Sequence, residues 1–325
     1  MNRFRLGGVW SFILRRLLLG IVVLILVSFL VFLATQALPG DPARAILGRS
    51  ATPASLAALR RQLHLDQPVI SQYWTWVTGL LQGNLGRSLA AQEPVTTLLA
   101  PRLVNSAVLV EIAAVVSIPL SIAIGSWAAF RREKVFDTVS TNLLLALAAL
   151  PEFVVAVVLV IFFATTVFPR FLPAISTVPP GSRPWDNWTA LVLPTLTLVI
   201  AVAPYVARIM RASMIEVLES DYVEMARLKG LPERTVLLRH ALPNALGPVF
   251  QVIALNLAYL AGGIIVVEYV FNYTGIGSAI QEAVFNHDLP VIQALAMLIA
   301  AVYVGLNLLA DVATILVTPK LRTRL

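Results

Sequence analysis

The sequence predicts an all-α integral membrane protein with six transmembrane helices. It also predicts a helical outer loop between the first two helices and a cytoplasmic helical insert between the fourth and fifth. Hydrophobic residues make up 58% of the 325 residues, and the mean hydropathy is +0.85, well above the level of soluble domains. Charged residues make up only 13%, and they gather between apolar runs that are long enough to cross a bilayer.

The net charge of +7 does not indicate nucleic-acid binding. The basic residues lie at the ends of apolar segments, where membrane orientation and anionic lipid explain them better. The lipid bilayer is therefore a predicted partner and nucleic acid is not. The chain has no cysteine, so it has neither a disulfide framework nor a thiolate metal site.

Residues 1–16 are predicted to form a cytoplasmic N-terminus with four arginines, and residues 17–37 to form the first transmembrane helix. A secretory signal is the alternative, because Thr35 and Ala37 resemble a cleavage site. However, the apolar run is about 21 residues long, which exceeds a signal h-region and matches a span of about 30 Å. We interpret it as a retained helix.

Residues 38–102 are predicted to form an extracytoplasmic loop with turns at 38–42 and 83–89. Two apolar stripes at helical spacing indicate amphipathic helices that are too short to cross the membrane. They are expected at the outer interface or packed as a small cap, together with Trp74. The stripes consist of Leu56, Leu59 and Leu63, and of Val69, Tyr73, Trp76 and Leu80.

Residues 103–318 are predicted to form a transmembrane domain of five helices, followed by a cytoplasmic C-terminus at 319–325. Prolines are expected to kink the second span at Pro119 and to break the fourth at Pro194 and Pro204. Pro151 and Glu152 lie within the third span. The expected spans are 103–130, 138–167, 189–210, 244–270 and 290–317.

The distribution of positive charge predicts the orientation. Sixteen of the 24 lysines and arginines lie at the N-terminus, in the second loop, around the insert and at the C-terminus, whereas the short loops 168–188 and 271–289 hold two. The first loop holds six, but loops of that length report orientation poorly. Both termini and the insert are therefore predicted to be cytoplasmic.

The insert, residues 221–243, reads as two short helices around a tight turn. Asp221 is the expected N-cap, and Glu224 completes a capping-box pattern. Gly230 falls at the C′ position, where a positive φ favours glycine. Pro232 is expected to open a second helix, which stops before Pro243. A basic loop that only fixes topology is the alternative interpretation.

Five residues of the insert stand at the spacing of a known motif: Glu224, Ala226, Gly230, Leu242 and Pro243. This spacing resembles the EAA loop of ABC-importer permeases (E-A-A, three residues, G, nine residues, I-x-L-P). Met225 and His240 depart from it, which a packing motif tolerates. The run ARLKGLPERTVLLRHALPNALGPV resembles the dipeptide/oligopeptide branch, and the similarity covers nearly the whole chain, with departures at Ala313 and Thr318.

The resemblance implies one permease subunit of a binding-protein-dependent peptide importer in a bacterial inner (plasma) membrane. Its implied partners are a second homologous permease, two cytoplasmic ABC ATPase subunits that use ATP and Mg²⁺, an extracytoplasmic substrate-binding protein and the peptide. The coupling helix in loop 211–243 would dock on an ATPase. The implied docking residues are Asp221, Glu224, Ala226, Arg227, Gly230, Leu231, Pro232, Leu242 and Pro243.

Enzyme chemistry is not predicted, and neither is a cofactor or metal held by this chain. The sequence contains no G-x-x-x-x-G-K-[ST], H-E-x-x-H or G-x-S-x-G pattern. His64, His240 and His287 are too scattered for a metal site. The Gly275–Gly277 pair lacks a third glycine, and we interpret it as a turn.

Four acids lie within the predicted spans, and each should face the bundle interior, water or a cationic partner. Glu111, Glu152 and Glu268 are candidates for a hydrophilic substrate path, with Glu152 beside Pro151 the most suggestive. Asp311 is the fourth. Buried pairing with a neighbouring helix, including a helix of a partner subunit, is the alternative.

Two other functions stay open. The same architecture could import a nickel chelate, glutathione or an oligosaccharide. An ATP-independent secondary transporter or channel would predict internal symmetry between the two halves of the chain. We see no such repeat, and the insert would then lack a purpose.

Overall fold

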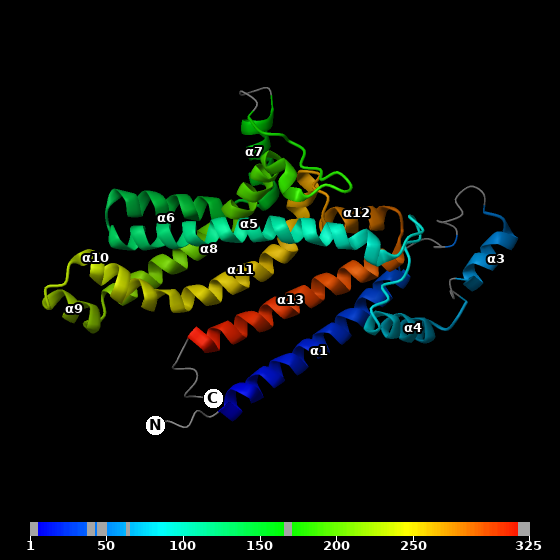
Figure 1. Ribbon diagram of the computed structural model, residues 1–325, viewed down its shortest axis with the longest axis horizontal. Helices are drawn as coiled ribbons and strands as arrows, with labels where there is room; N and C mark the ends of the chain where they lie inside the picture. Colours follow the sequence, from blue (N-terminus) through cyan, green and yellow to red (C-terminus); the bar gives the residue numbers. More distant parts are fainter. Residues whose placement is uncertain (1–5, 38–42, 44–50, 63–65, 166–170, 318–325) are drawn as a thin grey trace.

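The computed structural model describes residues 6–37, 43, 51–62, 66–165 and 171–317 (Figure 1). Within that part all regular structure is helical, apart from one isolated bridge between Arg87 and Pro94. Four helices are long and apolar enough to cross a membrane, and there are six spans if each of two bent pairs counts as one. Six is the predicted number. The four long helices are α1 (Leu6–Ala37), α5 (Val95–Phe130), α8 (Trp188–Leu218) and α13 (Leu289–Val317). Helix α11 (Leu242–Val270) belongs to one of the bent pairs.

Helix α8 lies at the centre of the bundle and packs against α5, α11, α6 and α7. The predicted breaks at Pro194 and Pro204 are wrong, because α8 continues through both prolines. Both are buried among neighbouring helices. In a membrane helix such neighbours can compensate for the backbone hydrogen bond that a proline removes. Helix α5 likewise continues through Pro119.

The third span is not one helix. It consists of α6 (Val135–Ala148) and α7 (Glu152–Ala164), which meet at 107°. Pro151 has no N–H to donate, and it disfavours helical geometry at the residue before it, so the chain turns there. The span predicted over 138–167 is therefore two helices joined at a sharp bend. A second bend, of 55°, separates Glu233–Leu257 from Gly262–Val270.

The segment between α1 and α5 contains α3 (Pro53–Gln62) and α4 (Val69–Leu81), which include the two apolar stripes apart from Leu63, a residue outside the described ones. Helix α4 packs on α1, where Tyr73 lies within hydrogen-bonding distance of Ser28 and Trp76 stacks on Phe32. Gly83 and Gly86 have positive φ in the predicted turn. Helix α5 begins at Val95, before the expected start at 103. The predicted turn at 38–42, His64, residues 1–5 and the predicted C-terminus at 319–325 lie outside the described residues. Helix α1 begins at Leu6, before the expected start at 17 and within the segment predicted as the N-terminus.

The sequence did not predict α12 (Ile276–Phe285) in the loop between the last two spans. Its apolar face packs against α5 and α13 through Ile276, Ala279 and Ala283. At the start of α13, Asp288 accepts hydrogen bonds from Ser88 and from the backbone of residues 89 and 90. The outer turn is thereby attached to the last helix pair.

Helix α1 lies along α13 (Figure 1). Arg16 Nε and Asp311 Oδ2 are 3.1 Å apart, so Asp311 has the cationic partner that an acid in a span requires. The two helices also approach closely at Gly20. A Cβ there would lie 2.8 Å from Val304 Cγ1.

Candidate functional site

The helical insert lies at one end of the bundle, and α3, α4 and α12 lie at the other (Figure 1). It begins with α9 (Asp221–Leu228), which follows directly on α8, and it returns through α10 (Glu233–Thr235). The described start of α1 and end of α13 lie toward the insert end. The insert is therefore a projection at the end of two long helices, α8 and α11.

The N-terminus of α9 differs from the prediction by one residue. Ser220 is the N-cap, and its carbonyl accepts a hydrogen bond from the Glu224 N–H at 3.1 Å. The Ser220 hydroxyl donates to the Val217 carbonyl and does not cap the helix. The predicted N-cap at Asp221 and the capping box are thus wrong. Asp221 and Glu224 instead stand in the first turn, where negative charge suits the helix dipole.

The corner after α9 is held by two backbone hydrogen bonds around Gly230. The Gly230 N–H donates to the Arg227 carbonyl at 2.9 Å, and the Leu231 N–H donates to the Ala226 carbonyl at 3.4 Å. With φ at +76° for Gly230, this is the Schellman termination. The prediction of a positive φ at this glycine is confirmed.

The second arm differs from the prediction at both ends. Pro232 is the N-cap and not the first helical residue, so α10 begins at Glu233. The helix then does not stop before Pro243. It widens into a π-helical turn at Val236–Ala241 and continues as α11. Pro243 stands in the first turn of α11, directly after the π-helical turn, so the N–H that it lacks falls at the junction between the two helix types.

A small apolar core joins the two arms. Val223, Ala226 and Val236 are buried together, and Val217 and Leu218 at the end of α8 pack against them. An ion pair with a distance of 2.8 Å between Arg227 Nη2 and Glu233 Oε1 links the two sides of the glycine corner. The arms are therefore fixed to each other and to α8.

The outward face of the insert is exposed and mixed in character. Leu228 is 75% exposed, and the other large apolar side chains on this face also contact solvent: Tyr222, Met225, Leu231 and Leu238. Most of the predicted docking residues are exposed as well: Asp221, Glu224, Arg227, Gly230, Pro232 and Pro243. Of the others, Ala226 is buried and Leu242 is half-buried. The insert thus presents apolar side chains ringed by both signs of charge.

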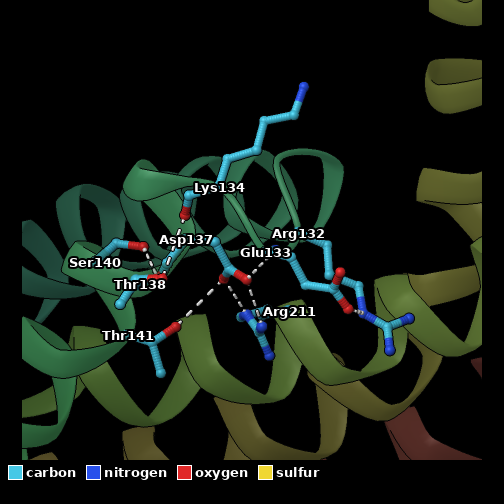
Figure 2. Close-up of polar contacts among 8 residues, drawn as sticks. All are labelled: Arg132, Glu133, Lys134, Asp137, Thr138, Ser140, Thr141 and Arg211. Atoms are coloured by element: carbon cyan, nitrogen blue, oxygen red, sulfur yellow. Dashed lines mark hydrogen bonds and ion pairs between the residues drawn. The ribbon is translucent and has the colours of Figure 1, made fainter.

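A charged cluster behind the insert was not predicted (Figure 2). Arg211 of α8 forms a two-point ion pair with Asp137 of α6, and the Glu133 N–H donates to Asp137 at 3.1 Å. Arg132 forms an ion pair with Glu219 at the end of α8. These residues attach the turn between α5 and α6 to the helix that leads into the insert. From the sequence alone, Arg211 was one of the basic residues used to predict the membrane orientation, and no partner was predicted for it.

The predicted substrate-path acids do not share one environment. Glu268 is fully buried and accepts hydrogen bonds from the Ser106 hydroxyl at 2.5 Å and from the Gly277 N–H at 2.6 Å. It therefore anchors the N-terminus of α12 to α5. Close by, the buried Tyr273 hydroxyl donates to the Asn105 carbonyl at 2.8 Å, and burial raises the pKa of this hydroxyl.

Glu152 and Glu111 are placed differently. Glu152 opens α7 at the bend and lies against Gly263 of α11, with one carboxylate oxygen buried. Glu111 is exposed on α5. In the part of the chain that the structure describes, no group of three or more His, Cys, Asp or Glu side chains could hold a metal ion.

Fold and insert together define a helical membrane protein with an exposed insert that is fixed to its long helices. Family models identify the class more closely. One described as "Binding-protein-dependent transport system inner membrane component" matches residues 121–323, and the corresponding N-terminal model matches residues 9–110. The chain belongs to this family of ABC-importer permeases, of the peptide/dipeptide type.

Relatives support the assignment along the whole chain. A probable peptide ABC transporter permease of Sinorhizobium fredii is 37% identical, with 96% of this chain and 99% of the relative covered. A glutathione transport system permease of Salmonella choleraesuis is also 37% identical, with the same coverage. A crystal structure of an amino acid ABC transporter with histidines has the same fold, with a TM-score of 0.52, 17% identity and coverage of 67% and 94%.

Proposed function

We propose that this chain forms half of the translocation pathway of an ATP-driven importer for di- and oligopeptides. A second, homologous permease supplies the other half. A binding protein delivers cargo from outside, and two separate ATPase subunits use ATP and Mg²⁺. Membership of the family supports this assembly. Membership of the family also disfavours the alternative of an ATP-independent transporter or channel.

The insert is the proposed contact with an ATPase subunit, and its construction is the observation that carries the proposal. Its corner is fixed by the Gly230 hydrogen bonds, the Arg227–Glu233 ion pair and the core around Val223. Its outward face exposes Met225 and Leu228, which the described residues of this chain leave uncovered. Such a rigid element transmits the movement of a docked partner to α8 and α11, whereas a flexible loop would deform and leave the two helices in place.

The proposed orientation places both termini and the insert in the cytoplasm. The charge distribution supports it. The bundle also supports it, since the described start of α1 and end of α13 lie toward the insert end. The opposite end, with α3, α4 and α12, then receives the binding protein.

Glu111, Glu152 and Glu268 remain proposed for the substrate path, in different roles. Glu268 already has its hydrogen-bond donors, so its contribution is to hold the outer end of the path in shape. Glu111 is exposed on α5 and would face the pathway or the partner permease, because an acid avoids lipid. Glu152 lies at the bend between α6 and α7, against α11.

Glutathione is the second candidate cargo, because permeases of glutathione systems are 36–37% identical over 96% of this chain. Uptake of a labelled dipeptide into cells that express the complete importer tests the choice. Excess unlabelled tripeptide should abolish the uptake, and excess glutathione should not. If glutathione alone competes, the importer carries glutathione. Co-purification of nucleotide-hydrolysing subunits with this chain tests the assembly.

A further inference from the structure

The bend between α6 and α7 brings a carboxylate against the fifth span. Pro151 ends the turn, and Glu152 is the first residue of α7. A Cβ placed on Gly263 would lie 2.8 and 2.9 Å from the two carboxylate oxygens of Glu152. The bend and the glycine together let the carboxylate lie directly on the backbone of α11.

This carboxylate lacks a counter-charge. Glu152 Oε1 is buried and has no hydrogen-bond partner among the described residues, and none of their ion pairs includes Glu152. The neighbouring acids differ: Asp137 is paired with Arg211, and Glu268 accepts hydrogen bonds from Ser106 and Gly277. An acid within a membrane span is costly when no cation faces it, and a functional role can explain why it is kept.

Two tyrosines border the carboxylate. The Tyr259 hydroxyl of α11 is within hydrogen-bonding reach of the Glu152 carboxylate, and Tyr205 of α8 lies near enough to Tyr259 to interact with it. Tyr205 also donates a hydrogen bond to the Ala148 carbonyl at the end of α6, at 3.3 Å. The two tyrosines are 45% and 52% exposed, so their rings stay open to the surroundings of this subunit.

These groups suit one chemistry. A carboxylate, aromatic rings and a carbonyl at a helix C-terminus each attract a cation, and a primary ammonium can donate to several of them at once. Arg208, one turn from Tyr205, forms no ion pair with Glu152 in the described structure.

We propose that Glu152, Tyr205 and Tyr259 bind the free amino group of the cargo as it crosses the membrane. The site rests on the proposed function, since it requires that this face line the pathway. It fits peptides with an unmodified amino terminus and, equally, glutathione, which also carries a primary ammonium. It gives no advantage to cargo without one.

The test uses the complete importer, reconstituted with its partner subunits and binding protein, and one peptide in two forms, with a free and with an acetylated amino terminus. The measured quantity is the ratio of uptake by the variant to uptake by the unmodified chain, taken for each form. This ratio cancels any preference of the binding protein. Glu152→Gln keeps the size and loses the charge, and Glu93→Gln, an exposed outer acid, is the matched control.

Glu152→Gln should lower uptake of the free-amine peptide about tenfold, the loss expected for one charge-assisted contact, and leave the acetylated peptide unchanged. Glu152→Asp should restore part of the loss, and Glu93→Gln should change neither. Stimulation of ATP hydrolysis by the binding protein should persist. If Glu152→Gln lowers uptake of both peptides equally, or of neither, the amino-group site is wrong and the proposed peptide function still stands. If the unmodified importer moves neither peptide, the proposed peptide function falls, and this site falls with it.

Discussion

Arg211 and Asp137 form a two-point ion pair, with Nε–Oδ1 and Nη2–Oδ2 distances of 2.5 and 2.7 Å (Figure 2). Asp137 is buried, and it also accepts the Glu133 N–H at 3.1 Å. The pair joins the start of α6 to α8, and α8 leads directly into the insert. Movement of the insert would therefore carry the turn between α5 and α6 with it.

Removal of one charge from this pair should destabilise the bundle. Asp137→Asn leaves the Arg211 guanidinium without its counter-charge, which should cost about 3 kcal/mol, near the lower end of the range for buried pairs because Arg211 is partly exposed. Thermal unfolding of the purified permease pair in detergent measures this. Glu133→Gln is the matched control, since the Glu133 side chain forms only an exposed ion pair, which contributes little. Equal melting temperatures for Asp137→Asn and Glu133→Gln would contradict the stabilising role of the Arg211–Asp137 pair.

Helices α5 and α8 approach most closely at Gly125. A Cβ there would lie 2.4 Å from the Ala207 carbonyl oxygen and 2.8 Å from Met210 Cβ. Gly125→Ala should therefore push the helices apart and cost about 1–3 kcal/mol. Gly305→Ala provides the comparison, because nothing in the described structure lies within 4 Å of its added Cβ. That change should be neutral or stabilising by up to about 1 kcal/mol. The same unfolding experiment separates the two outcomes.

The glycine corner of the insert should be sensitive to backbone geometry alone. Gly230 has φ of +76°, and open space surrounds the position of an added Cβ, so Gly230→Val meets no clash but must adopt left-handed geometry. The cost should be roughly 1–2 kcal/mol. Weaker stimulation of ATP hydrolysis by the loaded binding protein is expected. Gly230→Asn, which tolerates this geometry better, should lose less. Normal peptide uptake by the valine variant would count against the coupling role.

Glu268 should be required for the position of α12. Glu268→Ala leaves the Ser106 hydroxyl and the Gly277 N–H without their acceptor, at about 1–3 kcal/mol for each buried donor. Hydrogen exchange across residues 276–285 should accelerate, while exchange in α9 at the far end of the bundle stays unchanged. Glu268→Gln retains an acceptor oxygen and should have a smaller effect. Unchanged exchange in the alanine variant would show that other contacts hold α12.

Features with a strong local cause could be predicted from the sequence. Six apolar runs indicate the spans, and the position of Gly230 after a helical repeat indicates the corner. The ends of the helices were predicted less accurately. Ser220 and Asp221 are both good cap residues, so only the backbone geometry distinguishes them. The prolines of α8 were misread because the neighbours that stabilise an interrupted helix are not visible in one sequence.

Features that depend on contacts distant in the chain were missed. Helix α12 is short, and its apolar residues contact α5, far away in sequence, as well as the adjacent α13. Asp137 and Arg211 are separated by 74 positions, and nothing in either local pattern indicates the other. Glu152 was noticed because it stands beside Pro151, but its tyrosine neighbours come from two other helices. An acid and its surroundings can be assigned only when the helices have been placed.

Crosslinking tests most directly whether the insert docks on an ATPase in the cytoplasm. The chain has no cysteine, so Leu228→Cys, on the exposed face of α9, and Phe285→Cys, exposed on α12, each provide a single reactive site. In the assembled importer, Leu228→Cys should crosslink to a nucleotide-hydrolysing subunit and resist a membrane-impermeant thiol reagent in intact cells. Phe285→Cys should form no crosslink to that subunit and should react with the impermeant reagent in intact cells. External labelling at position 228, or the absence of any crosslink from it to an ATPase, would contradict the proposed coupling.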